Sequence, residues 1–248
     1  MRSRITLLAF LAAAVLGSGT AHAANFPINW LDHSPVPFGS PVPSGSVFFM
    51  PGVGNVTVTH NVAPVFTHTR FQNACLFPGT LTLGANTYSW LVHEMFAATL
   101  NSGPDPLVPV QWIITYTFTS TQPAGSMYVG ISGLGQTTSF GGGASVATVN
   151  QNGLFLGDWT GGCGPWGPTQ YTGGVGTFQM KNSMNGAGGQ DPHWNTPLGV
   201  VRIMDPVSSI SIIMDQIRGD GVGVNIGHAD SPTPSSGATW GRLKTLYR

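Results

Sequence analysis

The chain has 248 residues, and charged residues make up only 7% of it, with nine Lys and Arg against nine Asp and Glu. Such sparse and balanced charge offers nothing that would neutralise a phosphate backbone, so the composition argues against nucleic-acid binding. The chain contains 35 glycines and 19 prolines, which would suit a disordered protein, but its hydrophobic fraction of 41% is enough to build a core.

The first 23 residues have the features of a secretory signal peptide. Two arginines precede an apolar run over residues 5–16, and an Ala-His-Ala tripeptide follows at 21–23. The apolar run is shorter than the roughly 20 residues that a membrane-spanning helix needs. We therefore expect cleavage after Ala23, no transmembrane segment in the mature chain, and a protein that is secreted to the extracellular space or cell surface.

The two cysteines, Cys75 and Cys163, are expected to pair in an exported chain. A disulfide between them would close a loop of about 90 residues and stabilise the fold by up to roughly 4–5 kcal/mol in the chain-entropy description. Two free thiols are the alternative. Neither a Cys-x-x-Cys spacing nor a Cys/His cluster points to a metal or redox site.

Alternation of apolar and polar residues predicts strands along most of the mature chain. The clearest strand is 110–121, in which every second residue is apolar, namely Val110, Trp112, Ile114, Tyr116 and Phe118. Turn residues separate further predicted strands at 55–60, 64–70, 126–131, 144–149, 153–158, 174–180, 198–204, 208–217 and 222–227.

Residues 81–92 predict a hairpin that turns at Gly84, Ala85 and Asn86. Residues 89–100 fit both a strand and a helix, and we expect them to continue the hairpin as a strand. The remainder of the mature chain contains no convincing amphipathic helix.

This pattern predicts an all-β protein with a single two-sheet antiparallel β-sandwich over residues 46–230, of jelly-roll or immunoglobulin-like type. The prolines of residues 24–45 oppose regular structure, so this segment is expected to be an extended arm lying on the domain. Residues 231–248 are expected to form a Pro/Ser linker and a short C-terminal tail.

The run 207–227 contains the tripeptide Arg218-Gly219-Asp220, which can be interpreted as an adhesion motif or as part of a turn. Asp-Gly between two strand-like runs is a strong hairpin signal, because both residues tolerate positive φ. We therefore expect 208–217 and 222–227 to form a hairpin. Calcium could bind at Asp220 only if the fold brings other carboxylates close to it, such as Asp158, Asp215 and Asp230. One carboxylate cannot supply the six to eight oxygen ligands that calcium takes.

The same run, together with the glycine-rich stretch 131–153, resembles exported bacterial β-sandwich proteins of unknown function, many of which carry a PEP-CTERM sorting tag. The resemblance implies an exported β-sandwich and names no activity. The tag itself is absent, because no Pro-Glu-Pro, apolar anchor or arginine cluster follows residue 230. The tail TWGRLKTLYR (239–248) instead resembles short C-terminal tails of exported bacterial proteins, which implies a sorting or attachment signal.

No catalytic motif stands out in the sequence. The patterns GxSxG, HExxH and GxxxxGK[ST] are missing. The single glutamate, Glu94, lies beside His93 among large apolar residues, where burial would raise the pKa of a carboxyl group. Glycoside hydrolysis needs a second carboxylate, and no Asp is singled out as its partner. We expect no catalytic residue, with Glu94 as the one candidate, and no cofactor unless calcium binds.

Aromatic and polar side chains gather in two Gly/Pro-rich stretches, 157–171 and 186–197, and the predicted ligand-binding residues are Trp159, Trp166, Tyr171, Asp191, His193 and Trp194. Aromatic faces stack on sugar rings, and neighbouring polar groups bond to hydroxyls. The same rings could instead cover the ends of the sandwich. We expect a non-catalytic extracellular or cell-surface protein that binds carbohydrate or matrix. The alternatives are a secreted hydrolase of polysaccharides or esters and a purely structural surface component.

Overall fold

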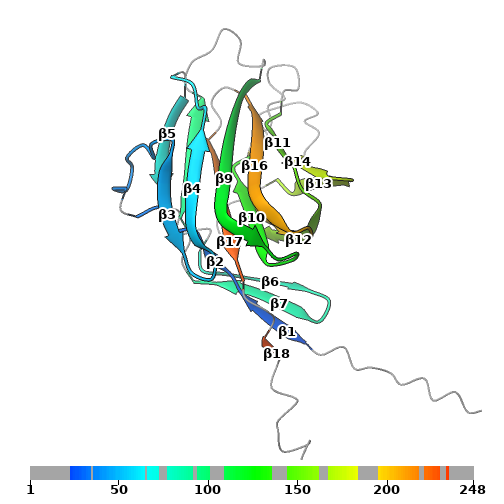
Figure 1. Cartoon of the computed structure of the whole chain (residues 1–248). Coiled ribbons are helices and arrows are strands. Elements are labelled where there is room, and N and C mark those ends of the chain that lie inside the picture. Colours follow the sequence, from blue (N-terminus) through cyan, green and yellow to red (C-terminus); the bar gives the residue numbers. More distant parts are fainter. Residues whose placement is uncertain are drawn as a thin grey trace, which may run out of the picture.

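The computed structural model describes residues 23–34, 36–64, 66–72, 77–91, 94–100, 109–135, 144–161, 167–183, 195–217, 221–229 and 233–234. All the regular elements within these ranges are strands, which confirms the all-β class (Figure 1). The strands form three sheets, so the prediction of a single two-sheet sandwich was wrong.

The central sheet has the strand order β12 (Gly153–Trp159), β15 (Leu198–Ile203), β10 (Met127–Ser132), β17 (Gly221–His228), β8 (Met95–Leu100) and β5 (Phe66–Phe71), and β2 (Asn29–Trp30) also pairs with β17. The outer sheet has the order β13 (Thr169–Gly174), β14 (Thr177–Asn182), β11 (Val146–Val149), β16 (Val207–Gln216), β9 (Val110–Gln122), β4 (Gly54–His60) and β3 (Ser46–Met50). The small sheet has the order β18 (Thr233–Pro234), β1 (Ala24–Pro27), β7 (Asn86–Trp90) and β6 (Gly79–Leu83). In this sheet β1 pairs with β7 in parallel, unlike the antiparallel pairs expected.

The main hydrophobic core lies between the central and outer sheets. The alternation that marked residues 110–121 as a strand points Trp112, Ile114 and Tyr116 of β9 into this core, where all three are fully buried. Completely burying a side chain the size of isoleucine contributes about 1.5–3 kcal/mol, so the apolar faces of the paired sheets hold the sandwich together.

The predicted hairpin over 208–227 does not form, because its two strands lie in different sheets. β16 pairs with β9 and β11 of the outer sheet, whereas β17 pairs with β10, β8 and β2 of the central sheet. Ile212 on β16 and Val224 on β17 are both buried in the same core and approach it from opposite sides. Arg218-Gly219-Asp220 lies between these strands, outside the described residues.

Two other predicted strands divide differently in the structure. The hairpin at 81–92 is confirmed as β6 and β7, but the chain does not continue it to residue 100, because β8 is a separate strand of the central sheet. The predicted strand 174–180 spans a turn between β13 and β14, which pair with each other.

The small sheet covers one end of the far face of the central sheet (Figure 1). At that end the central sheet is therefore buried on both faces. This second core is built around Trp30, which is 6% exposed. A Cβ atom added to Gly130 or Gly227 would lie 2.9 Å from the Trp30 ring. Glycines in the central sheet therefore make room for the indole.

The proline-rich segment after β2 is hydrogen-bonded to both large sheets. The Gly39 N–H donates to the Arg70 carbonyl of β5 at 3.0 Å, and the Gly45 N–H donates to the Val58 carbonyl of β4 at 2.8 Å. Between these bonds, Val42 is fully buried in the main core. Residues 36–45 thus lie along one side of the sandwich.

Candidate functional site

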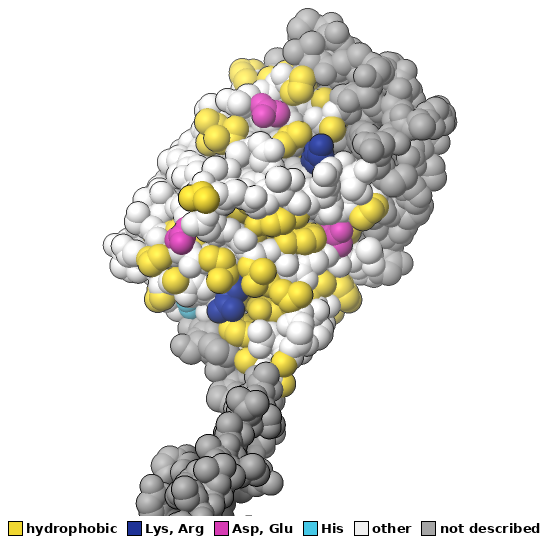
Figure 2. Space-filling view, turned by 90° about the vertical axis from the view of Figure 1, so that its right-hand side faces the viewer, with side chains coloured by type: hydrophobic (Ala, Val, Ile, Leu, Met, Phe, Trp, Pro, Cys, Tyr) yellow, Lys and Arg dark blue, Asp and Glu magenta, His cyan; other side chains and the backbone are white. Residues whose placement is uncertain are grey.

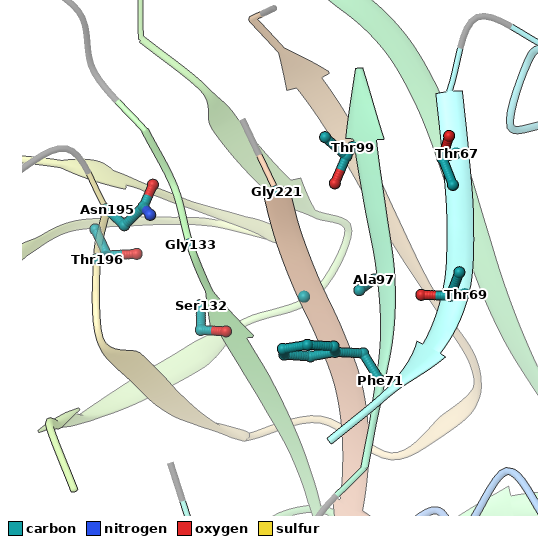
Figure 3. Close-up of a pocket in the computed structure, with 11 residues that line it drawn as sticks. Thr67, Thr69, Phe71, Ala97, Thr99, Ser132, Gly133, Asn195, Thr196 and Gly221 are labelled. Atoms are coloured by element: carbon teal, nitrogen blue, oxygen red, sulfur yellow. The ribbon is translucent and has the colours of Figure 1, made fainter. Parts of the chain in front are cut away.

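A hollow of about 270 Å³ lies on the far face of the central sheet, beyond the end that the small sheet covers (Figure 3). Its lining comes from four strands and two loop segments, and comprises Thr67, Thr69, Phe71, Ala97, Thr99, Ser132, Gly133, Asn195, Thr196, Gly221 and Gly223. None of the residues that the sequence analysis proposed as ligand contacts is among them.

Small residues in the two middle strands form the floor of the hollow. In β17, Val222 and Val224 point into the main core, so Gly221 and Gly223 lie on the opposite face. Gly223 pairs with Ala97 of β8 on one side and with Ser132 of β10 on the other. Because Gly221 and Gly223 carry no side chain, the surface of the sheet at β17 is lower than at the flanking strands β8 and β10.

The wall on β5 is built from alternate residues of that strand. Thr67 and Thr69 lie opposite Thr99 and Ala97 of β8. Two residues further on, Phe71 ends the strand with 37% of its surface exposed. Figure 3 shows its ring extending from β5 across β8, with the Thr69 hydroxyl directed toward Ala97. The hollow therefore has an aromatic surface at one end and hydroxyl groups along its side.

The opposite wall is fixed by hydrogen bonds between residues 133–134 and Thr196. The Gly133 N–H donates to the Thr196 carbonyl at 3.0 Å, and the Leu134 N–H donates to the Thr196 Oγ1 at 3.0 Å. Thr196 itself is buried, and its N–H donates to the Leu134 carbonyl at 3.2 Å. This wall is therefore formed before any ligand arrives.

The chemistry of the lining is polar and uncharged. Five hydroxyl side chains, one amide and one phenyl ring face a floor of glycine and alanine, and none of the described lining residues titrates near neutral pH. Such a surface can stack on a ligand and exchange hydrogen bonds with it, but it supplies no general acid or base.

Glu94 lies at the core side of the sheet and outside this hollow. Both of its carboxylate oxygens accept hydrogen bonds from Arg70, one of them from Nε at 2.8 Å. The His33 N–H also donates to the carboxylate at 3.2 Å, and Asp32 Oδ1 lies 3.9 Å from Arg70 Nη2. Hydrogen bonding to Glu94 raises the pKa of Arg70. The carboxylate predicted as a candidate acid is therefore held in a half-buried ion pair that ties the segment after β2 to β5.

Two predicted ligand-binding aromatics pack against the protein itself. Trp159 is part-buried against the second core and meets Trp90 edge-to-face, with ring centroids 6.1 Å apart. Tyr171 stacks on Phe155 at 5.4 Å, and its hydroxyl donates to the Gly153 carbonyl at 2.6 Å. These contacts agree with the alternative in which the rings cover the ends of the sandwich.

The other predicted site residues lie outside the described residues, namely Trp166, Asp191, His193, Trp194, Asp220, Cys75 and Cys163. Their proposed roles in binding, calcium coordination and the disulfide stay predictions. Gly167 and Asn195, which directly follow Trp166 and Trp194 in the chain, are joined by a hydrogen bond of 2.9 Å. Asn195 also lines the hollow.

The carboxylates considered for calcium do not assemble within the described ranges. Asp158 lies on β12 of the central sheet, whereas Asp215 lies on β16 of the outer sheet. Burial raises the pKa of Asp158, and its Oδ2 accepts a hydrogen bond from the Thr169 N–H at 2.8 Å. Among the described residues, no group of three or more His, Cys, Asp and Glu could hold a metal ion.

No protein-family model, curated protein or solved structure matches this chain. In the part of the chain that the structure describes, no helix has the length and apolar character required to cross a membrane.

The sequence does not reveal the hollow, because its lining consists mostly of small uncharged residues. The signals that mark it are short and alternate along the strands, Thr-x-Thr-x-Phe at 67–71 and Gly-x-Gly at 221–223. Each is ordinary by itself, and only the pairing through β8 brings them together.

Proposed function

We propose that this chain is an exported, non-catalytic β-sandwich protein, of jelly-roll or immunoglobulin-like type, that binds carbohydrate in the extracellular space or in a surface matrix. The observation that carries the proposal is the composition of the hollow on the central sheet, whose described lining combines hydroxyl and amide groups with one exposed phenyl ring and no titratable group.

A sugar ring complements this kind of surface. Its hydroxyl groups both donate and accept hydrogen bonds, as the side chains of Thr69, Thr99 and Asn195 can do. Its C–H face is apolar and can lie against the ring of Phe71. Ligand sites in general combine apolar surface with a few oriented polar groups, and here both come from strands and a hydrogen-bonded wall.

The state of Glu94 supports a non-catalytic protein. A glycosidase acid must carry a proton and reach the glycosidic oxygen, with a second carboxylate nearby. Glu94 instead accepts hydrogen bonds from Arg70 on both oxygens and from the His33 N–H. These bonds occupy the carboxylate oxygens that a catalytic acid would direct toward a substrate.

The low charge of the surface supports an extracellular location. Figure 2 shows groups of hydrophobic side chains among uncharged ones, with Lys, Arg, Asp and Glu present only as isolated residues. Trp166 and Trp194 remain predicted ligand contacts in this proposal.

Affinity electrophoresis tests the proposal. The mature chain, residues 24–248, is run through gels that contain neutral or acidic polysaccharides. Binding predicts retardation by at least one neutral polysaccharide, reduced in a Thr69→Val variant. The matched control is Thr117→Val, which makes the same change on the exposed face of β9 in the other large sheet. Absence of retardation in every gel would support a structural surface component, and release of reducing ends would support a hydrolase.

A further inference from the structure

The floor of the hollow is longer across the strands than along them. One row crosses four strands in register, from Thr69 through Ala97 and Gly223 to Ser132. Three gaps between neighbouring strands span about 14 Å, at roughly 4.7–4.9 Å each. Along the strands the floor consists of two rows, in which residues two positions apart are separated by about 7 Å, and Phe71 of the third row forms a wall. A ligand that fills this space runs perpendicular to the strands.

Side chains close the hollow beyond its second row, on the side of the small sheet. Met95 lies next to Ala97 on the same face of β8, two residues earlier in the chain. Its sulfur accepts a hydrogen bond from the Ser132 hydroxyl at 3.2 Å. A Cβ atom added to Gly223 would lie 2.7 Å from that sulfur. Phe71 pairs with Met95 in the same row. Together they form a ledge parallel to the long axis of the hollow.

From these dimensions we propose that the hollow binds a linear, uncharged, extended β-linked glycan that lies across β5, β8, β17 and β10. This inference rests on the proposed function and specifies its ligand. A β-1,4-linked chain is a flat ribbon that presents hydroxyl groups on its edges at a repeat close to the strand spacing. The groups that meet it, on Thr69 and Ser132, lie at opposite ends of one row, and the floor between them consists of Ala97 and Gly223.

The lack of charge in the described lining selects against acidic glycans. A carboxylated or sulfated sugar would lose hydration on entering the hollow, and none of the described lining residues carries a positive charge that would compensate. The curved chain of an α-1,4-linked glucan would not follow a straight row across four strands. Linkage geometry and neutrality therefore define the ligand class.

Gly223 is the residue that determines this specificity, because it lies in the middle of the row. A methyl group there would rise from the floor beneath the central ring of the ligand. Met95 is flexible at its thioether end, so the side chain can shift and the strand can keep its place. Gly174→Ala is the matched control, because Gly174 is also a strand glycine but lies in β13 of the other large sheet.

Isothermal titration of the mature chain with oligosaccharides of two to six rings tests the inference. The β-1,4-linked series are cello-, chito- and manno-oligosaccharides, and the α-1,4-linked control is the malto series, which has the same glucose units as the cello series. For at least one β-linked series, affinity should rise with each added ring until the chain spans the row. The maltohexaose should bind at least about tenfold more weakly than the hexamer of that series.

Gly223→Ala should lower the affinity for the hexamer by about tenfold, which corresponds to roughly 1.4 kcal/mol. Gly174→Ala should leave it unchanged, and circular dichroism shows whether both variants stay folded. Equal affinity for dimer and hexamer, or for cello- and maltohexaose, would overturn this inference while leaving carbohydrate binding intact. Absence of binding by every oligosaccharide and every polysaccharide gel would overturn the proposed function as well.

Discussion

His33 lies fully buried beside the ion pair of Arg70 and Glu94, and its ring meets Phe48 edge-on at 5.2 Å. Neither ring nitrogen has a hydrogen-bond partner within the described part of the chain. Burial lowers the pKa of His33 from 6.5 to about 4, with the charge of Asp32 opposing the shift and that of Arg70 adding to it. The imidazole is therefore neutral in the folded protein at neutral pH.

This shift makes the free energy of unfolding depend on pH. Between pH 6.5 and about 4 the unfolded chain binds a proton at His33 and the folded chain does not, so acid favours unfolding in this window. At 1.36 kcal/mol for each pKa unit, the shift predicts a loss of about 3 kcal/mol between pH 7 and pH 4. Above pH 7 this residue contributes no further change.

Urea unfolding of the mature chain, followed by tryptophan fluorescence at pH 7, 5.5 and 4, measures this loss. His33→Leu fills the site with an apolar side chain and removes the titration. The free energy of unfolding of this variant should therefore fall less on acidification, by about 3 kcal/mol at pH 4. Other groups titrate equally in both proteins, and the difference between them isolates His33. Parallel profiles for the two proteins would refute the reasoning.

Two other substitutions test the packing. Glu94→Gln should lower the free energy of unfolding at pH 7 by about 3 kcal/mol in urea unfolding, because it leaves Arg70 without its carboxylate partner. The control Asp215→Asn, at a solvent-exposed hydrogen bond, should change the free energy of unfolding little. Equal effects of Glu94→Gln and Asp215→Asn would contradict a stabilising ion pair between Arg70 and Glu94. Trp30→Ala should cost about 3–5 kcal/mol in the same assay through the cavity it leaves. Phe49→Ala, at a residue 68% exposed, should cost far less, and a small loss for Trp30→Ala would show that the second core is dispensable.

The alternation of side chains was sufficient to locate most strands of the two large sheets. In β9 and β16 one face is apolar and the other polar, and this pattern depends only on the local chain. Pairing was not predictable in the same way. The apolar residues of β16 and β17 face one core from opposite sheets, and a sequence pattern with a period of two is identical for a hairpin and for a crossing between sheets.

The third sheet and the hollow were missed for a shared physical reason. Both depend on glycines of β10 and β17 that lie on the face of the central sheet away from the main core, where these residues give no hydrophobic signal. Gly227 accommodates Trp30 of a distant segment, whereas Gly221 and Gly223 line the hollow, with the Met95 side chain next to Gly223. Nothing local distinguishes these cases, because the difference lies in which segment packs above each glycine.

The measurement that tests the central claim most directly compares two phenylalanines on different faces of the molecule. Phe71→Ala removes the aromatic surface of the hollow, and Phe49→Ala removes a more exposed ring from β3 of the outer sheet. The dissociation constant for a neutral polysaccharide that retards the mature chain is measured for the native protein and both variants. Binding in the hollow predicts that Phe71→Ala weakens affinity by about tenfold, within the 0.5–1.5 kcal/mol range of aromatic contacts, while Phe49→Ala has no effect. Equal affinity for Phe71→Ala and the native protein would contradict the proposed site.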